Sequence, residues 1–148
     1  ITLTASFATE GGVNVTPANP PSITLNVPQS APEITALQLG GKTGNSLSIL
    51  ITGYSTTRSV RQMELQLTPV PGVNMSSTRF TINVDSAFLA WYQSAASQQF
   101  GSLFTATLPI TFEGSAPSGG NLVDAIQSIS LGLANASGSS ATKTLGLR

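Results

Sequence analysis

The chain has 148 residues, the size of one domain, and it contains no cysteine and no histidine. These absences remove disulfides, thiolate metal sites, thiol nucleophiles and the usual general base, so most hydrolase and metalloenzyme designs are excluded. Six acidic residues balance six basic ones, and the net charge therefore gives no reason to expect nucleic acid or an anionic membrane as a partner.

Charged residues make up only 8% of the chain, against about 25% in ordinary soluble domains. Ser, Thr, Asn and Gln supply 54 residues and must provide the solubility instead. This composition is typical of secreted and surface-exposed β proteins, so we expect an extracellular or cell-surface location. No apolar run approaches the length of a membrane span, and membrane insertion is not expected. Because the chain opens on Ile1, we expect it to be an excerpt from something longer.

Apolar residues alternate with Thr and Ser in two N-terminal segments, 1–7 and 23–27. This alternation predicts a β-hairpin over residues 1–27. Two strands are too few to fold alone. The hairpin is therefore expected to be the remnant of a preceding β-domain, or to add its strands to a sandwich, in its own chain or in a neighbouring copy.

A linker is predicted over residues 28–33, before the main domain. It contains Pro28 and Pro32, which favour extended backbone and have no N–H for a β-ladder. We therefore expect the compact domain to span residues 34–148.

The rest of the chain predicts an all-β, immunoglobulin-like sandwich of about seven strands. Short alternating runs are separated by Gly, Pro, Asn and Ser clusters, which is the pattern of such sandwiches. The predicted strands are Ile34–Leu39, Leu47–Gly53, Val60–Leu67, Arg79–Val84, Leu103–Phe112, Ile126–Leu133 and Thr142–Leu147.

One segment departs from the two-residue rhythm. Phe88, Trp91, Tyr92 and Ala95 fall at helical spacing after Asp85, a residue type favoured as N-cap. The spacing predicts one short crossover helix over residues 86–97, with its aromatic face packed on the sandwich.

The candidate ligand-stacking residues are Trp91 and Tyr92, because an amphipathic aromatic pair can stack on a sugar ring. Their helical spacing with Phe88 and Ala95 favours packing against the core instead. No residue is assigned a catalytic, cofactor-binding or metal-binding role, and no cofactor is expected.

Four charged residues complete the candidates. Arg58 and Arg61 bracket a strand start, where a surface role or a pair with Glu64 is favoured over recognition of a carboxylate. Glu113 and Asp124 flank one long loop, where solvated charges are favoured over a pair of glycoside-cleaving acids.

Several stretches resemble a known group of domains. They are the run from Thr57 to Pro69, the aromatic run from Val84 to Pro109, and the opening at residues 1–7 with its later Ala31-Pro32. Together they resemble immunoglobulin-like domains at the end of large secreted multidomain proteins of environmental bacteria, acidobacteria especially. The resemblance implies an immunoglobulin-like fold and an extracellular location. It supplies neither an activity nor any ligand-contacting residue.

The sequence therefore favours a non-enzymatic, structural or adhesive module of a bacterial surface or secreted protein. Expected partners are neighbouring domains or copies of the chain itself, through sheet edges, and surface glycans or proteins. Two alternatives remain open at this point: a self-assembling fibre subunit that exchanges residues 1–27, and a carbohydrate-binding module.

Overall fold

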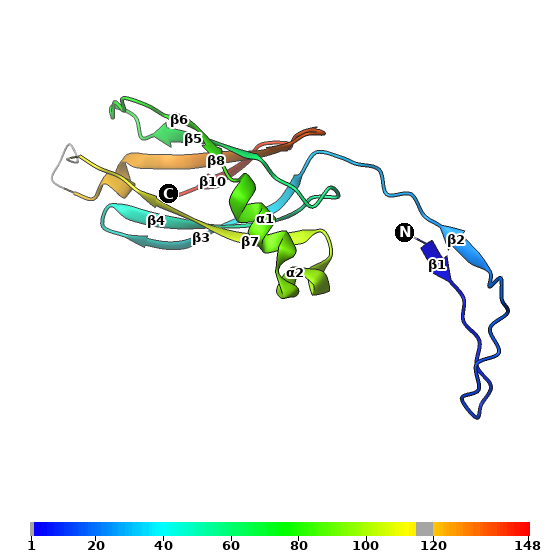
Figure 1. Cartoon of the computed structure of the whole chain (residues 1–148). Coiled ribbons are helices and arrows are strands. Elements are labelled where there is room, and N and C mark those ends of the chain that lie inside the picture. Colours follow the sequence, from blue (N-terminus) through cyan, green and yellow to red (C-terminus); the bar gives the residue numbers. More distant parts are fainter. Residues whose placement is uncertain (1, 115–119) are drawn as a thin grey trace.

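A computed structural model describes residues 2–114 and 120–148. The fold is an all-β sandwich with a separate N-terminal hairpin, as the residue alternation predicts (Figure 1). The strands of the sandwich are β3 (Glu33–Thr43), β4 (Ser46–Tyr54), β5 (Gln62–Pro69), β6 (Arg79–Asn83), β7 (Leu103–Thr111), β8 (Ile126–Asn135), β9 (Gly138–Ser139) and β10 (Lys143–Gly146).

The two sheets of the sandwich are antiparallel and differ in width. One has the order β3-β4-β7, and the other has the order β10-β8-β5-β6, with the short β9 paired to β8. All seven strands predicted after residue 33 are present, while β9 and a 3-10 turn, η1 (Leu122–Ala125), were not predicted. Within the described ranges, no helix is long and apolar enough to cross a membrane.

The core lies between the two sheets and comes mainly from alternate residues of β4, β5 and β8. In β4 the residues that face inward are Leu47, Ile49 and Ile51, and all three are buried. They meet Leu65, Leu131 and other inward residues of the second sheet in one continuous hydrophobic cluster. This is the arrangement that a period of two residues produces in a strand with one buried face.

The crossover between β6 and β7 contains two helices where one was predicted: α1 (Asp85–Gln93) and α2 (Ala95–Phe100). Ser94 separates them because its backbone is extended, with φ −69° and ψ 150°. The Ser94 hydroxyl accepts the Ser97 N–H at 3.2 Å, which caps α2, and donates to the Trp91 carbonyl at 2.6 Å.

The prediction that Asp85 caps the crossover was wrong by one position. Asp85 is the first residue of α1, and the N-cap position belongs to Val84, which makes no side-chain cap. Asn83 takes over the role of acceptor, because its Oδ1 receives the Asp85 N–H at 3.0 Å. Asp85 instead places a carboxylate in the first turn, where it interacts favourably with the helix dipole.

The N-terminal hairpin pairs β1 (Thr2–Thr4) with β2 (Ser22–Thr24) in antiparallel register, and Figure 1 shows it standing apart from the sandwich. Its connection to the sandwich is fixed at Ser30. The Ser30 N–H donates to Thr56 Oγ1 at 3.0 Å, and the Ser30 carbonyl accepts from Asn135 Nδ2 at 2.9 Å. The connecting segment therefore leaves from the end of the sandwich where β4 and β8 finish.

Candidate functional site

Tyr92, one of the two candidate stacking residues, is an internal residue. Its side chain is 6% exposed and packs beside Phe88, with the ring centroids 6.4 Å apart. Its hydroxyl donates to the Ser102 carbonyl at 3.0 Å. Burial raises the pKa of Tyr92 to about 12, although the neighbouring Arg58 charge acts in the opposite direction. The ring of Tyr92 is therefore closed to a ligand.

Trp91 differs from its neighbour because its ring is only half-buried. The indole N–H donates to the Leu103 carbonyl at 3.2 Å, which fixes the ring over the start of β7. Beside it lies a pocket of about 300 Å³, lined by Thr52, Trp91, Phe100, Leu103, Phe104 and Thr105. Of the predicted pair, Trp91 alone borders a place where a ligand could sit.

This Trp91 pocket is strongly apolar. Phe100 at the end of α2 and Leu103 at the start of β7 are 54% and 49% exposed, respectively. The polar side chains in its lining are those of Thr52 and Thr105, which are register partners on β4 and β7. The pocket therefore offers aromatic and aliphatic surface with two hydroxyl groups, which suits a flat, largely apolar ligand face.

Arg58 has a structural role that the sequence did not predict. Its guanidinium donates to the carbonyl oxygens of Tyr92 at 2.6 Å and Gly101 at 2.9 Å, which lie at the C-terminal ends of α1 and α2. It also donates to the hydroxyl of buried Ser97 at 3.2 Å. A cation at a helix C-terminus is favourable because it satisfies free carbonyl groups and the helix dipole. These contacts engage both Nη atoms of the guanidinium, which favours a structural role over recognition of a ligand carboxylate.

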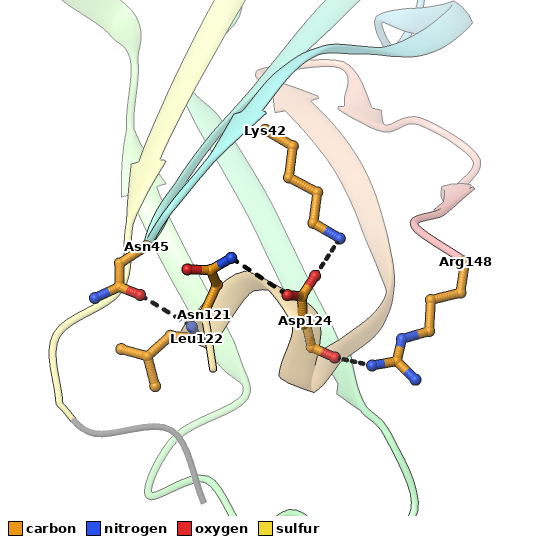
Figure 2. Close-up of polar contacts among 6 residues, drawn as sticks. All are labelled: Lys42, Asn45, Asn121, Leu122, Asp124 and Arg148. Carbon is orange, nitrogen blue, oxygen red and sulfur yellow. Dashed lines mark hydrogen bonds and ion pairs between the residues drawn. The ribbon is translucent and has the colours of Figure 1, made fainter. Parts of the chain in front are cut away.

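Asp124, one of the two candidate acids that flank the long loop, is engaged by a cation (Figure 2). Lys42 Nζ lies 2.7 Å from Asp124 Oδ1, and Asn121 Nδ2 lies 3.5 Å from Oδ2. The hydrogen bond from Lys42 lowers the pKa of this carboxyl group below its usual value. A carboxyl group held in its ionised form by a lysine is a poor general acid, so Asp124 does not fit that role.

The surroundings of Asp124 tie three segments together at one end of the sandwich. In Figure 2 the Asn45 side chain accepts the Leu122 N–H, at 2.9 Å, and the Arg148 side chain donates to the Asp124 carbonyl. The turn between β3 and β4, the η1 turn and the C-terminal residue therefore meet here. Among the described residues, no group of three metal-ligating side chains occurs, here or elsewhere.

An open slot lies between β6 and β7, on the edge of the sandwich opposite β3 and β10. It has a volume of about 610 Å³, and its apolar lining includes Leu65, Phe80, Ile82, Leu108, Ile110 and Phe112. Phe80 and Leu108 are register partners of the buried Leu65 and Ile49, so they face the interior of the sandwich. Phe80 is nevertheless 39% exposed. The edge of the core is therefore left open at this place.

The N-terminal hairpin carries a second apolar surface. Leu3 and Ile23 are direct register partners and therefore point to the same face. Further along, the Val15 N–H donates to the Phe7 carbonyl at 2.9 Å. Leu3, Phe7, Val13, Val15 and Ile23 are each about half exposed or more. Such a collection of exposed apolar side chains on one hairpin is typical of an interaction surface.

Comparison with known proteins finds no matching family model, no similar curated protein and no similar solved structure. The function must therefore be argued from the chemistry of these surfaces.

Proposed function

We propose that this chain is a non-enzymatic structural and adhesive module, of the immunoglobulin-like kind, in a bacterial surface or secreted protein. One observation carries the proposal. The side chains of Arg58, Lys42 and Asp124 hold the crossover helices and the η1 turn to the sandwich, while the Trp91 pocket and the slot are lined mainly by apolar residues. In the described part of the chain, every buried side-chain nitrogen or oxygen also has a hydrogen-bond partner. Groups engaged in this way support a scaffold rather than acid–base or nucleophilic chemistry.

The strand order supports the immunoglobulin-like assignment. With the seven main strands numbered in chain order from β3, one sheet has the order 1-2-5 and the other has the order 7-6-3-4. In constant-type immunoglobulin domains the same numbering gives 1-2-5-4 and 7-6-3. The two arrangements differ only in the fourth strand. Here that strand is β6, which pairs with β5, and the helices α1 and α2 then return the chain to β7.

The composition supports a place outside the cytoplasm. A domain with 8% charged residues, no cysteine and many Ser and Thr residues resembles surface β proteins more than cytosolic enzymes.

The test of the proposed function has two arms. Antibodies against the chain should label intact cells or the culture medium of the source bacterium, and the purified chain should turn over none of a panel of chromogenic esters, glycosides and peptides. Antigen found in the cytoplasm alone, or turnover above that of a heat-denatured sample, would contradict the proposal.

A second candidate function is carbohydrate binding at the Trp91 pocket. It is favoured by one observation, the half-exposed indole beside a 300 Å³ hollow that also contains Phe100. Trp91 is the single tryptophan of the chain, so its fluorescence reports directly on that pocket.

The experiment is a titration of the chain with soluble cell-wall and plant polysaccharides, followed by tryptophan fluorescence. Binding should shift the emission to shorter wavelength, and Phe100→Ala should weaken the binding, whereas Leu89→Ala, which removes an exposed apolar residue of α1 outside the pocket lining, should leave it unchanged. An unchanged spectrum with every polysaccharide would remove this candidate.

A further inference from the structure

One sheet of the sandwich has five strands and the other has three, and the slot lies where this difference leaves an edge uncovered. β6 is the outermost strand of the wider sheet, and β7 is the outermost strand of the narrower one. Near the start of β7, α1 covers the edge, since Phe88 packs edge-on against Phe104 with centroids 4.9 Å apart. Beyond that point Phe80 is left 39% exposed, and the slot of about 610 Å³ lies open beside residues 108–112.

The edge of β7 is suited to receive a strand. Its sequence from Leu103 to Thr111 contains no charged residue, although charged residues are a common protection of exposed edges. Pro109 has no N–H, and in a sheet such a residue turns its nitrogen away from the paired strand, so here it offers an added strand only its carbonyl oxygen. Thr105 and Thr107 have the same parity as Pro109, so their N–H and C=O groups point to the open edge.

The first arm of the hairpin, which contains β1 and the residues after it up to Ala8, is suited to fill the slot. Residues 2–8 contain no charge and no proline, and Leu3, Ala5 and Phe7 alternate with Thr and Ser. An extended strand with this pattern presents apolar side chains to one face and hydroxyl groups to the other. The returning segment of the hairpin contains Pro17, Pro20 and Pro21, which cannot donate to a ladder, and is less suited.

We propose that residues 2–8 of one copy add as a strand to the β7 edge of a second copy, with Leu3 and Phe7 covering its Phe80. The occupant is another copy because the hydrogen bonds of Ser30 to Thr56 and Asn135 direct the hairpin away from its own sandwich. Figure 1 shows the hairpin beyond one end of the sandwich and the Thr111 end of β7 toward the other. A contact between two different surfaces of the same molecule is heterologous, and it produces head-to-tail filaments unless the rotation between copies closes a ring.

The test uses the absence of cysteine from the chain. One preparation carries Thr4→Cys or Ser6→Cys on the first arm of the hairpin, and a second carries Thr107→Cys on the β7 edge. When the two are mixed under mild oxidation, a disulfide-linked heterodimer is expected. The matched control replaces Thr107→Cys by Gln38→Cys, which lies on β3 of the same sheet and outside the slot, and should give at least tenfold less product.

Sedimentation velocity over a range of concentrations supplies the second readout. The unmodified chain should form larger species as its concentration rises. Phe7→Ser should prevent this, and Leu89→Ser, which alters an exposed apolar residue on α1, should not.

Three results would overturn the proposal: monomers at every concentration, equal cross-linking of Thr107→Cys and Gln38→Cys, or a chain carrying both Thr4→Cys and Thr107→Cys that closes on itself at high dilution. The last result would place the strand in its own slot. None of them bears on the proposed structural role of the sandwich, which has separate tests.

Discussion

The guanidinium of Arg58 lies 5.2 Å from the centroid of the Tyr92 ring and also donates a hydrogen bond to the Tyr92 carbonyl. Arg58 belongs to the loop between β4 and β5, and its backbone has φ 51°, a left-handed conformation that is uncommon outside glycine. This conformation places the Arg58 cation against the C-terminal ends of both crossover helices. The helices α1 and α2 are therefore held to the sandwich by a residue far from them in sequence.

Removal of the Arg58 side chain should destabilise the domain. Arg58→Ala loses three hydrogen bonds from a charged donor, for which we expect a cost of about 2–4 kcal/mol in the free energy of unfolding. Arg61→Ala is the matched control, because Arg61 is exposed, and it should change stability by less than about 0.5 kcal/mol. Urea denaturation measures the stability of both variants. Equal urea midpoints for Arg58→Ala and Arg61→Ala would show that the Arg58 side chain does not stabilise the domain.

Gly53 should be intolerant of any side chain. It is a buried residue of β4, and a Cβ built on it would lie 2.3 Å from the Glu33 carbonyl oxygen and 2.6 Å from Phe104 Cζ. Gly53→Ala must therefore move a strand or a core ring, and such overpacking costs about 1–3 kcal/mol. Gly132→Ala on β8 is the control, since its nearest side-chain atoms would lie at 3.8 and 3.9 Å. Thermal denaturation should show a lower Tm for Gly53→Ala and an unchanged Tm for Gly132→Ala.

The stability of the domain should fall in alkaline solution because of Tyr92. The pKa of this residue is about 12 in the folded chain, against 10.0 for an ordinary tyrosine. Between these values the unfolded chain loses the proton and the folded chain keeps it, so unfolding becomes more favourable as pH rises. Below pH 10 the contribution is complete. Tyr92→Phe should flatten the fall in unfolding free energy between pH 10 and 12, and an unchanged slope would place the hydroxyl in solvent.

The Asp124 carboxyl group should change the stability of the domain in acidic solution. Its contribution is lost as the pH falls, whereas that of Tyr92 is lost as the pH rises. Its folded pKa is lowered by the hydrogen bond from Lys42, so the contribution is present above the usual value of 3.8 and is lost as pH falls through the folded pKa. Asp124→Asn should therefore be less stable than the unmodified chain at neutral pH and equal to it in strong acid. The effect should be small, because the pair is exposed, and it should shrink in high salt. A difference that persists in strong acid would point to another cause.

The sequence predicted the sandwich because each strand obeys one local rule. Residues such as Leu47, Ile49 and Ile51 alternate with polar or small neighbours, and the period of two is readable without knowledge of the partner strands. The helical crossover was also visible from Phe88 and Trp91. Its break was not, because apolar spacing continues across Ser94; the signal that could have shown it is Ser94 three residues before Ser97, the spacing of an N-cap.

The features that depend on strand order could not be read from the sequence. Arg58 meets residues 34 and 43 positions away, and no local pattern marks such a pairing. The slot exists because β6 joins the wider sheet, a choice of partner that the alternation in residues 79–83 does not specify. The burial of Tyr92 beside the exposure of Trp91 likewise follows from how α1 meets β7, since both residues have the same helical neighbours.

The most direct test of this account is hydrogen–deuterium exchange of the full chain, followed peptide by peptide. At high dilution the amides of β4 and β8 should be protected, whereas those of residues 2–24 should exchange within seconds, because an isolated hairpin is marginally stable in water. At high concentration, protection should rise in residues 2–8 and in β7 together. A hairpin as protected as β4 in the dilute sample would contradict the account, because it would show that the apolar face of the hairpin packs on its own sandwich.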